Sequence, residues 1–83
     1  MIENIIVEVR LFAYLRELFP HENRGVEKVE IPIDFTIDNL LDKIGVKEKE
    51  IMIIMVNGLR KQDPNDKLKN GDRVGIFPPV GGG

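Results

Sequence analysis

The feature that most constrains the fold is one amphipathic helix, predicted at residues 36–45, in a chain whose other regular segments read mostly as strands. Four apolar residues recur at the spacing of one helical face: Ile37, Leu40, Leu41 and Ile44. Thr36 suits the start of this helix, and Gly45 suits a left-handed residue at its end. A single helix covers a single face of a sheet, so the 83 residues predict one α+β domain.

Alternating apolar residues predict the first two strands. Residues 5–11 alternate at period two, as in a strand with one buried face. Residues 12–19 then carry apolar side chains at spacings of three and four, which predicts a short helix of about two turns. Alternation returns at residues 26–33, where we expect Ile33 on the buried face. Pro32 predicts that this strand lies at a sheet edge.

The next segment, residues 51–56, is apolar at every position and ends in Asn57-Gly58, a strong hairpin signal followed by a short return strand. Its second apolar face would be exposed unless the short helix, a loop or a partner covers it. The last strand, residues 73–77, should place Val74 and Ile76 inward. Phe77 would then point outward, where an exposed aromatic can anchor a partner. The expected architecture is a mixed sheet of four to five strands on one main helix.

The side chains offer little for catalysis or metal binding. The chain has no cysteine and no serine, which removes thiolate ligands, cysteine nucleophiles and Ser-His-Asp triads. The one histidine, His21, lies in a polar loop without a second imidazole. Residues 63–66 lack calcium-loop spacing, and Asp38 and Asp42 should face water. We therefore expect no enzyme activity of its own, no metal and no bound cofactor.

Charge and hydropathy bear on partners and location. Residues 1–42 hold nine acidic and four basic side chains, whereas residues 43–83 hold five and eight, so the basic half could speed association with a partner. Without a basic stripe interleaved with aromatic residues, we expect no nucleic acid ligand. No apolar run approaches the roughly 18 residues that a membrane helix needs. The first residues lack a basic leader, so we expect a cytoplasmic protein.

The C-terminus is the most unusual segment: residues 77–83 read Phe-Pro-Pro-Val-Gly-Gly-Gly. The two prolines favour a stiff, extended stem. The glycines can pass through a channel too narrow for side chains and present the carboxylate of Gly83 to another protein's active site. A linker is the alternative, although a linker needs no stiff apolar stem. We expect a domain at residues 1–79 and a flexible glycine tail at residues 80–83.

With this tail and this order of elements, the chain resembles the ubiquitin-like sulfur carriers, and most closely the small subunit of molybdopterin synthase, the MoaD family. The resemblance rests on five segments: residues 9–18, 36–41, 55–58, 68–74 and 77–83. It implies a β-grasp fold. The thiamine-pathway carriers share the final glycine pair, but they are usually shorter and lack the first-helix segment and the Pro-Pro stem.

The resemblance also implies a reaction cycle. An E1-like enzyme uses ATP to adenylate the carboxylate of Gly83, which has Gly82 as its glycine partner. A sulfur donor protein then supplies the sulfur of a thiocarboxylate, and the large subunit of molybdopterin synthase takes up the tail, where sulfur passes to a pterin precursor. The resemblance assigns five residues to partner binding: Phe77, Pro78, Pro79, Val80 and Gly81.

Two other functions are compatible with the sequence. A ubiquitin-like modifier would undergo the same activation and then be joined through Gly83 to lysines of target proteins. A β-grasp interaction module would need no chemistry at the tail, so deleting Gly82 and Gly83 would leave its function intact.

Overall fold

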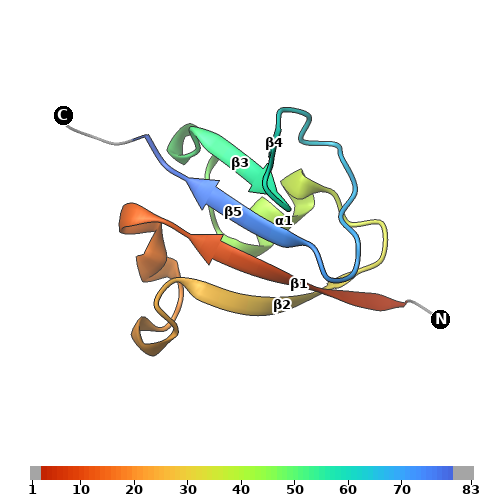
Figure 1. The fold of residues 1–83 in the computed structure, drawn as a ribbon, viewed down its shortest axis with the longest axis horizontal. Coiled ribbons are helices and arrows are strands. Elements are labelled where there is room, and N and C mark those ends of the chain that lie inside the picture. Colours follow the sequence, from red (N-terminus) through yellow and green to blue (C-terminus); the bar gives the residue numbers. More distant parts are fainter. Residues whose placement is uncertain (1–2, 80–83) are drawn as a thin grey trace.

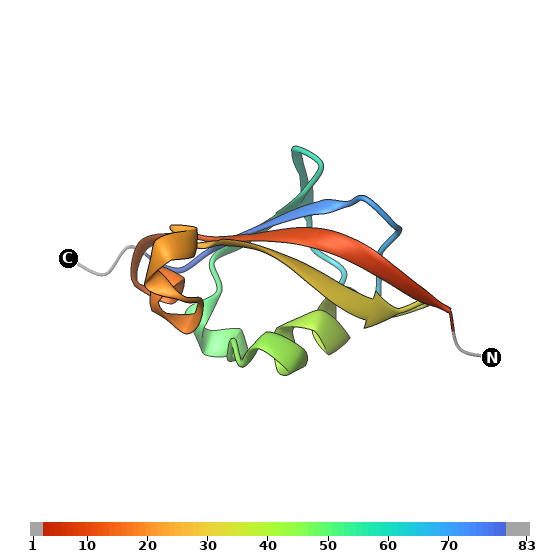
Figure 2. The same ribbon diagram turned by 90° about the horizontal axis from the view of Figure 1, so that it is seen from below.

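A five-stranded mixed sheet packed on one helix forms the body of the molecule (Figures 1 and 2). The computed structural model describes residues 3–79. Its elements follow the chain as β1 (Asn4–Leu11), η1 (Ala13–Leu18), η2 (His21–Asn23), β2 (Val26–Pro32), α1 (Ile37–Ile44), η3 (Glu48–Glu50), β3 (Ile53–Val56), β4 (Leu59–Lys61) and β5 (Arg73–Phe77). The predicted α+β class and mixed sheet are confirmed.

The sheet order is β2-β1-β5-β3-β4, which brings the first and last strands together at the centre. β1 and β5 are parallel, and the other neighbouring strands are antiparallel. Because β5 lies between β1 and β3, the strand that leads to the C-terminal stem is held on both sides. β2 lies at an edge, as Pro32 predicted.

The core lies between one face of the sheet and α1 (Figure 2). β1 contributes four buried residues, and α1 contributes Ile37, Leu40 and Leu41. β5 adds Val74 and Ile76, which are 1% and 0% exposed, so their predicted inward orientation is confirmed. Together with Ile31 of β2 and Val56 of β3, these side chains fill one continuous core.

The main helix has the predicted boundaries because both ends are capped. The Thr36 hydroxyl accepts a hydrogen bond from the Asn39 backbone N–H, and the Asn39 side chain accepts one from the Thr36 N–H, both at 3.1 Å. This capping box satisfies backbone donors that the first helical turn leaves without partners. At the other end Gly45 adopts a φ of 87°, which a residue without a Cβ tolerates best.

The segment predicted as a two-turn helix is partly a strand extension. Phe12 has extended dihedral angles, and its N–H donates to the carbonyl of Ile76 at 3.2 Å, so it prolongs the contact between β1 and β5. A left-handed Ala13, with φ of 52°, then turns the chain into a 3₁₀ helix over residues 13–18. The helical placement of Phe12 was wrong because hydrogen bonding to β5 outweighs a local apolar spacing.

The prediction for Ile33 was also wrong. Ile33 follows the end of β2 and is 47% exposed. It shares the parity of the fully buried Ile31, but α1 does not reach this far along the sheet, as Figure 2 shows for the end of β2. Alternation therefore identified the correct face of β2, but α1 is too short to cover Ile33, which follows the end of that strand.

Candidate functional site

Residues 51–56, which are apolar at every position, give the sheet an apolar patch on the face away from α1. In β3, Ile54 and Val56 pair with Ile76 and Val74 of β5 and share their orientation toward the core. Ile53 and Met55 alternate onto the opposite face, and both are half-buried. Figure 2 shows α1 and η3 on the other side of the sheet and η1 and η2 at its end, so within residues 3–79 no helix covers this open face. The sequence analysis named the short helix at residues 12–19 as one possible cover for the second apolar face of residues 51–56. The structure excludes this helix as the cover.

Two stacked aromatic rings extend this patch. Phe77, on the open face as predicted, packs against Phe12 with ring centroids 4.0 Å apart and an interplanar angle of 9°. Phe77 is half-buried, so part of the expected exposed anchor is covered by its aromatic neighbour. The sequence analysis missed Phe12 because it assigned this residue to a helix. Its even position, two residues after Arg10 in the alternation of β1, was the signal that could have placed it here.

A hollow of about 410 Å³ lies on the open face beside these rings. Gly75 is among the residues that line it: an added Cβ would lie 3.4 Å from Phe12 Cε2 and 3.5 Å from a ring carbon of Phe77. Arg10 and Arg73 also line the hollow, and Arg10 forms an ion pair with Glu8 at 3.2 Å. The arrangement suits an apolar side chain of a partner, with acidic groups around it to meet the arginines.

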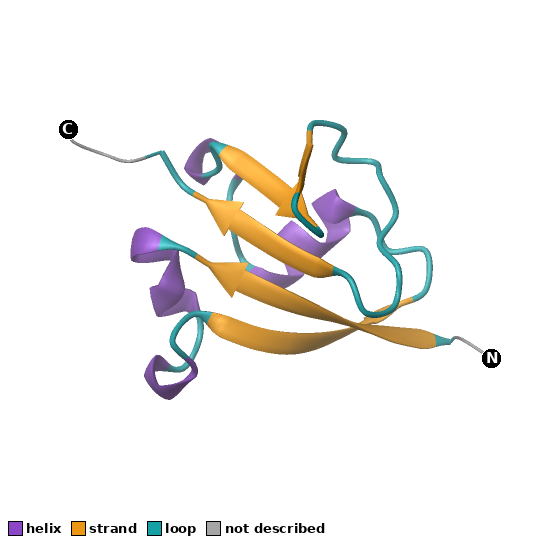
Figure 3. Cartoon of the chain, viewed as in Figure 1, coloured by secondary structure: helices purple, strands orange, loops and turns teal. Residues whose placement is uncertain are grey.

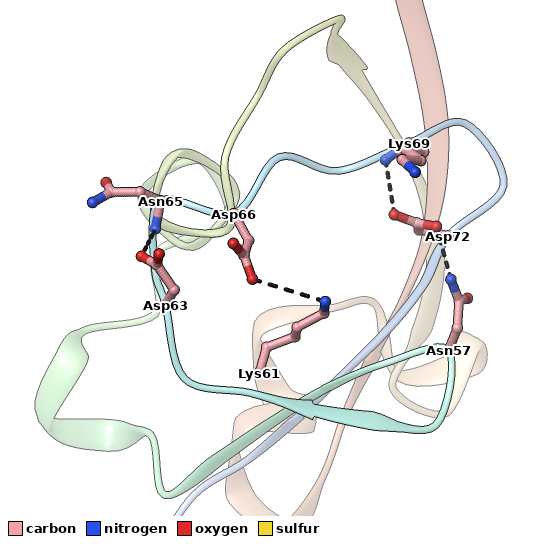
Figure 4. A network of polar contacts seen from close by, with 7 residues as sticks. All are labelled: Asn57, Lys61, Asp63, Asn65, Asp66, Lys69 and Asp72. Carbon is pink, nitrogen blue, oxygen red and sulfur yellow. Dashed lines mark hydrogen bonds and ion pairs between the residues drawn. The ribbon is translucent and has the colours of Figure 1, made fainter.

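Asn57 fixes one edge of this hollow to the start of β5 (Figure 4). Its side-chain amide donates to Asp72 Oδ1 at 2.8 Å, and its side-chain carbonyl accepts the Arg73 backbone N–H at 2.9 Å. The Lys69 N–H donates to Asp72 Oδ2 at 2.8 Å. Asn57 has a φ of 53° and Gly58 a φ of 82°, as in a two-residue hairpin turn, so the predicted hairpin is confirmed.

The polar residues 63–66 serve as a turn. The Asn65 N–H donates to Asp63 Oδ1 at 2.9 Å, and Asp66 lies 3.8 Å from the Lys61 ammonium group (Figure 4). Among residues 3–79, no group of three or more histidine, aspartate or glutamate side chains could hold a metal ion. The part of the chain in the structure also contains no helix that is long and apolar enough to cross a membrane.

The stem leaves β5 in a defined direction. The carbonyl of Phe77 accepts the Met52 N–H at 2.8 Å, which ties the end of β5 to the segment before β3. Pro78 is buried and Pro79 is half-buried. Pro78 thus orients the stem but offers little surface to a partner, whereas Pro79 is accessible. Val80, Gly81, Gly82 and Gly83, on which the tail prediction rests, lie outside the described residues.

The mixed sheet of order β2-β1-β5-β3-β4 packed on one main helix defines a ubiquitin-like β-grasp protein, which agrees with solved structures. A putative molybdopterin converting factor subunit 1 from Pyrococcus furiosus is similar at 31% identity over 92% of this chain and 99% of that chain, with a TM-score of 0.70. A family model described as the ThiS family matches residues 9–83. The chain therefore belongs to the ThiS family of ubiquitin-like sulfur carriers.

Two further structures bear on partners and function. A complex of subunits 1 and 2 of the molybdopterin-converting factor from Helicobacter pylori 26695 contains a chain similar at 30% identity, over 95% of this chain and all of that chain, with a TM-score of 0.59. The small archaeal modifier protein 1 from Methanosarcina acetivorans is similar at 27% identity over 98% of this chain and 99% of that chain, also with a TM-score of 0.59. No curated protein sequence matches the chain significantly.

Proposed function

We propose that this chain is the sulfur carrier and small subunit of molybdopterin synthase. Its Gly83 carboxylate is adenylated, converted to a thiocarboxylate and inserted into the large subunit, where it donates sulfur for the molybdenum or tungsten cofactor. An E1-like enzyme with ATP performs the activation, and a sulfur donor protein supplies the sulfur. This activity belongs in the cytoplasm.

One observation carries the proposal: the stem that leads to the terminal glycines leaves a central strand beside an uncovered apolar patch. Phe12 and Phe77 lie at the end of β5 from which the stem departs, and the hollow at Gly75 extends from these rings along the strand toward its start. A partner that receives the tail can therefore bind the patch at the same time. Two similar structures named as subunit 1 of the molybdopterin converting factor, one of them in a complex with subunit 2, support this assignment.

The chemistry explains why so few side chains are needed. A carboxylate is a poor acyl donor until one oxygen becomes part of a good leaving group, which adenylation provides. Attack on the acyl adenylate by sulfur at the oxidation level of sulfide, delivered by the donor, forms the C–S bond and expels AMP. The product is a thiocarboxylate, a soft nucleophile that carries sulfur without free sulfide. Enclosure of the tail in a partner limits hydrolysis by excluding water. The carrier contributes reach, recognition and a terminal group that can be activated.

Intact-mass measurement tests the proposal. After incubation with an E1-like enzyme, ATP and a sulfur source, we expect a gain equal to the exchange of one oxygen for one sulfur, located at Gly83. A variant with one alanine added after Gly83 keeps the domain unchanged and is the matched control, because its terminus is displaced. No gain in the unmodified chain, or an equal gain in the extended one, would contradict the proposal.

A protein modifier is the second candidate, favoured by the similarity to the small archaeal modifier protein 1. It would transfer activated Gly83 to lysine side chains of target proteins. Denaturing gels of cell extract distinguish the two functions, because a modifier gives a ladder of larger conjugates that disappears when Gly82 and Gly83 are deleted. A dedicated carrier gives few such bands.

A thiamine-pathway sulfur carrier is the third candidate, favoured by the family model. Its activation chemistry is the same, and only the acceptor differs. Purified thiocarboxylated chain should transfer sulfur to the pterin precursor in the presence of the large subunit of molybdopterin synthase. Transfer only to a thiamine-pathway acceptor would replace the main proposal by this one.

A further inference from the structure

A second cavity, of about 460 Å³, lies away from the open face, between η1 and η2. Figures 1 and 3 show these two short helices beside each other, at the end of the sheet where β1 ends and β2 begins. Its lining includes two arginines, a histidine and a tyrosine: Arg16, Arg24, His21 and Tyr14. Glu17 is the one acidic residue of the lining, so the cavity carries excess positive charge.

The guanidinium groups of the two arginines have no polar partner among residues 3–79. None of the ion pairs or side-chain hydrogen bonds formed among residues 3–79 includes Arg16 or Arg24, although Glu17 lines the same cavity. Guanidinium groups bind planar or tetrahedral oxyanions through paired N–H donors. Two such groups on one cavity therefore have capacity for an external anion.

Gly25 leaves space for the aliphatic part of the Arg16 side chain. A Cβ at this buried glycine would lie 2.7 Å from Arg16 Cγ, 2.8 Å from Arg16 Cδ and 2.6 Å from the Leu11 carbonyl oxygen. The aliphatic part of Arg16 thus lies directly on the glycine backbone, which is itself held by a 2.7 Å hydrogen bond from the Leu11 N–H to the Gly25 carbonyl. This contact restrains the stem of Arg16 at the cavity and lowers the entropy that ligand binding must remove.

Arg24 is held by an unfavourable backbone conformation. Its φ of 53° and ψ of 36° lie in the left-handed region, which a long side chain seldom occupies. The Arg24 N–H donates to the His21 carbonyl at 3.2 Å, which closes the turn. Asparagine or glycine would fit this position with less strain, and strained residues gather at functional sites.

We propose that this cavity binds a phosphate-class oxyanion through the guanidinium groups of Arg16 and Arg24. The hydroxyl of Tyr14 and the imidazole of His21 add hydrogen-bond donors, which a tetrahedral anion with several oxygens can use. The anion is either inorganic phosphate or the phosphate group of a nucleotide. This inference does not depend on the sulfur-carrier function, because the cavity contains none of the residues of the stem or tail.

Nuclear magnetic resonance titration tests the site. Backbone amide and arginine Nε–H signals of the full chain are followed during addition of sodium phosphate, with sodium chloride holding the ionic strength constant. We expect saturable shifts confined to residues 13–25. Shifts that do not saturate, or that spread evenly over all basic residues, would overturn the proposal.

Variants identify the groups responsible. Arg16→Gln and Arg24→Gln should each weaken phosphate binding roughly tenfold, as expected for loss of a charged hydrogen bond. Lys49→Gln, which removes the same charge from η3, should leave the affinity within about twofold. Circular dichroism confirms that each variant is folded. Equal losses in all three variants would show diffuse charge attraction, which contradicts a built site.

Parallel titrations distinguish the ligands. Tighter binding of AMP than of inorganic phosphate, with no shifts from adenosine, would assign a nucleotide, and equal binding would assign free phosphate. Acetate binding as tight as phosphate binding would refute the phosphate class. A chain without Gly82 and Gly83 should bind phosphate unchanged, so failure of this proposal and failure of the sulfur-carrier proposal give different results.

Discussion

The two faces of the sheet use the same strands for different purposes. On the helix side, Val74 and Ile76 of β5 are sealed beneath α1. On the open side, Gly75 and Phe77 of the same strand remain half-exposed beside arginines. One face is thus filled by the chain itself, whereas the other keeps an apolar patch with a hollow. Alternation at period two lets five residues serve both stability and recognition.

The largest expected effect is a loss of stability from a substitution on the helix side of the sheet. Leu40→Ala removes a side chain with 0% exposure from the centre of α1 and should lower the free energy of unfolding by about 2–5 kcal/mol. Chemical denaturation measures this loss. Lys43→Ala, on the exposed side of the same helix, is the control and should change stability by less than about 0.5 kcal/mol. Similar losses in both variants would contradict the assignment of the two sides of α1.

The next effect concerns the open side. Phe77→Ala should weaken binding of the large subunit by about 1–3 kcal/mol, as for an aromatic anchor. It should also cost about 1 kcal/mol of stability, because the stacking with Phe12 is lost. Calorimetric titration and denaturation measure the two quantities. Phe12→Ala should behave alike. A stability loss as large as that of Leu40→Ala would mean that this face belongs to the core.

A smaller effect tests the hollow, because binding and stability should change in opposite directions. Gly75→Ala places a methyl group in ordinary contact with the rings of Phe12 and Phe77. We expect about 0.5–1 kcal/mol more stability, since glycine is unfavourable within a strand, together with weaker partner binding. Gly58→Ala is the contrasting variant, because its φ of 82° makes any side chain strained. Unchanged partner affinity in Gly75→Ala would show that the partner does not enter the hollow.

The smallest effect is electrostatic. Arg10 and Arg73 at the hollow should speed association with an acidic partner, so the on-rate should fall as salt rises while the dissociation rate changes little. Stopped-flow measurements over a range of salt concentrations test this. An on-rate that does not depend on salt would remove these arginines from the encounter step.

The sequence predicted the regular elements well and the site only in part. Local rules were sufficient to predict the bounds of α1, because Thr36 and Gly45 cap its two ends. The first two N–H groups of the helix, those of Ile37 and Asp38, still depend on the tertiary fold, since they donate to carbonyls of the 63–66 turn. The inward positions of Val74 and Ile76 followed from alternation. Phe12 and Ile33 were misplaced because their environments depend on β5 and on the reach of α1, neither of which is visible in a local window.

The sequence by itself determined the periodicities, the caps, the turns and the composition of the C-terminal stem, since each depends on residues within a few positions of one another. Tertiary structure alone decided that β1 and β5 lie side by side, that Phe12 stacks on Phe77, and that Arg16 crosses Gly25. These contacts join residues that lie outside one another's local segments, from nine positions apart for Arg16 and Gly25 to 65 for Phe12 and Phe77. They form only when the whole sheet pairs, because ordering the chain costs conformational entropy. Burial of apolar side chains and hydrogen bonding between strands together offset that cost.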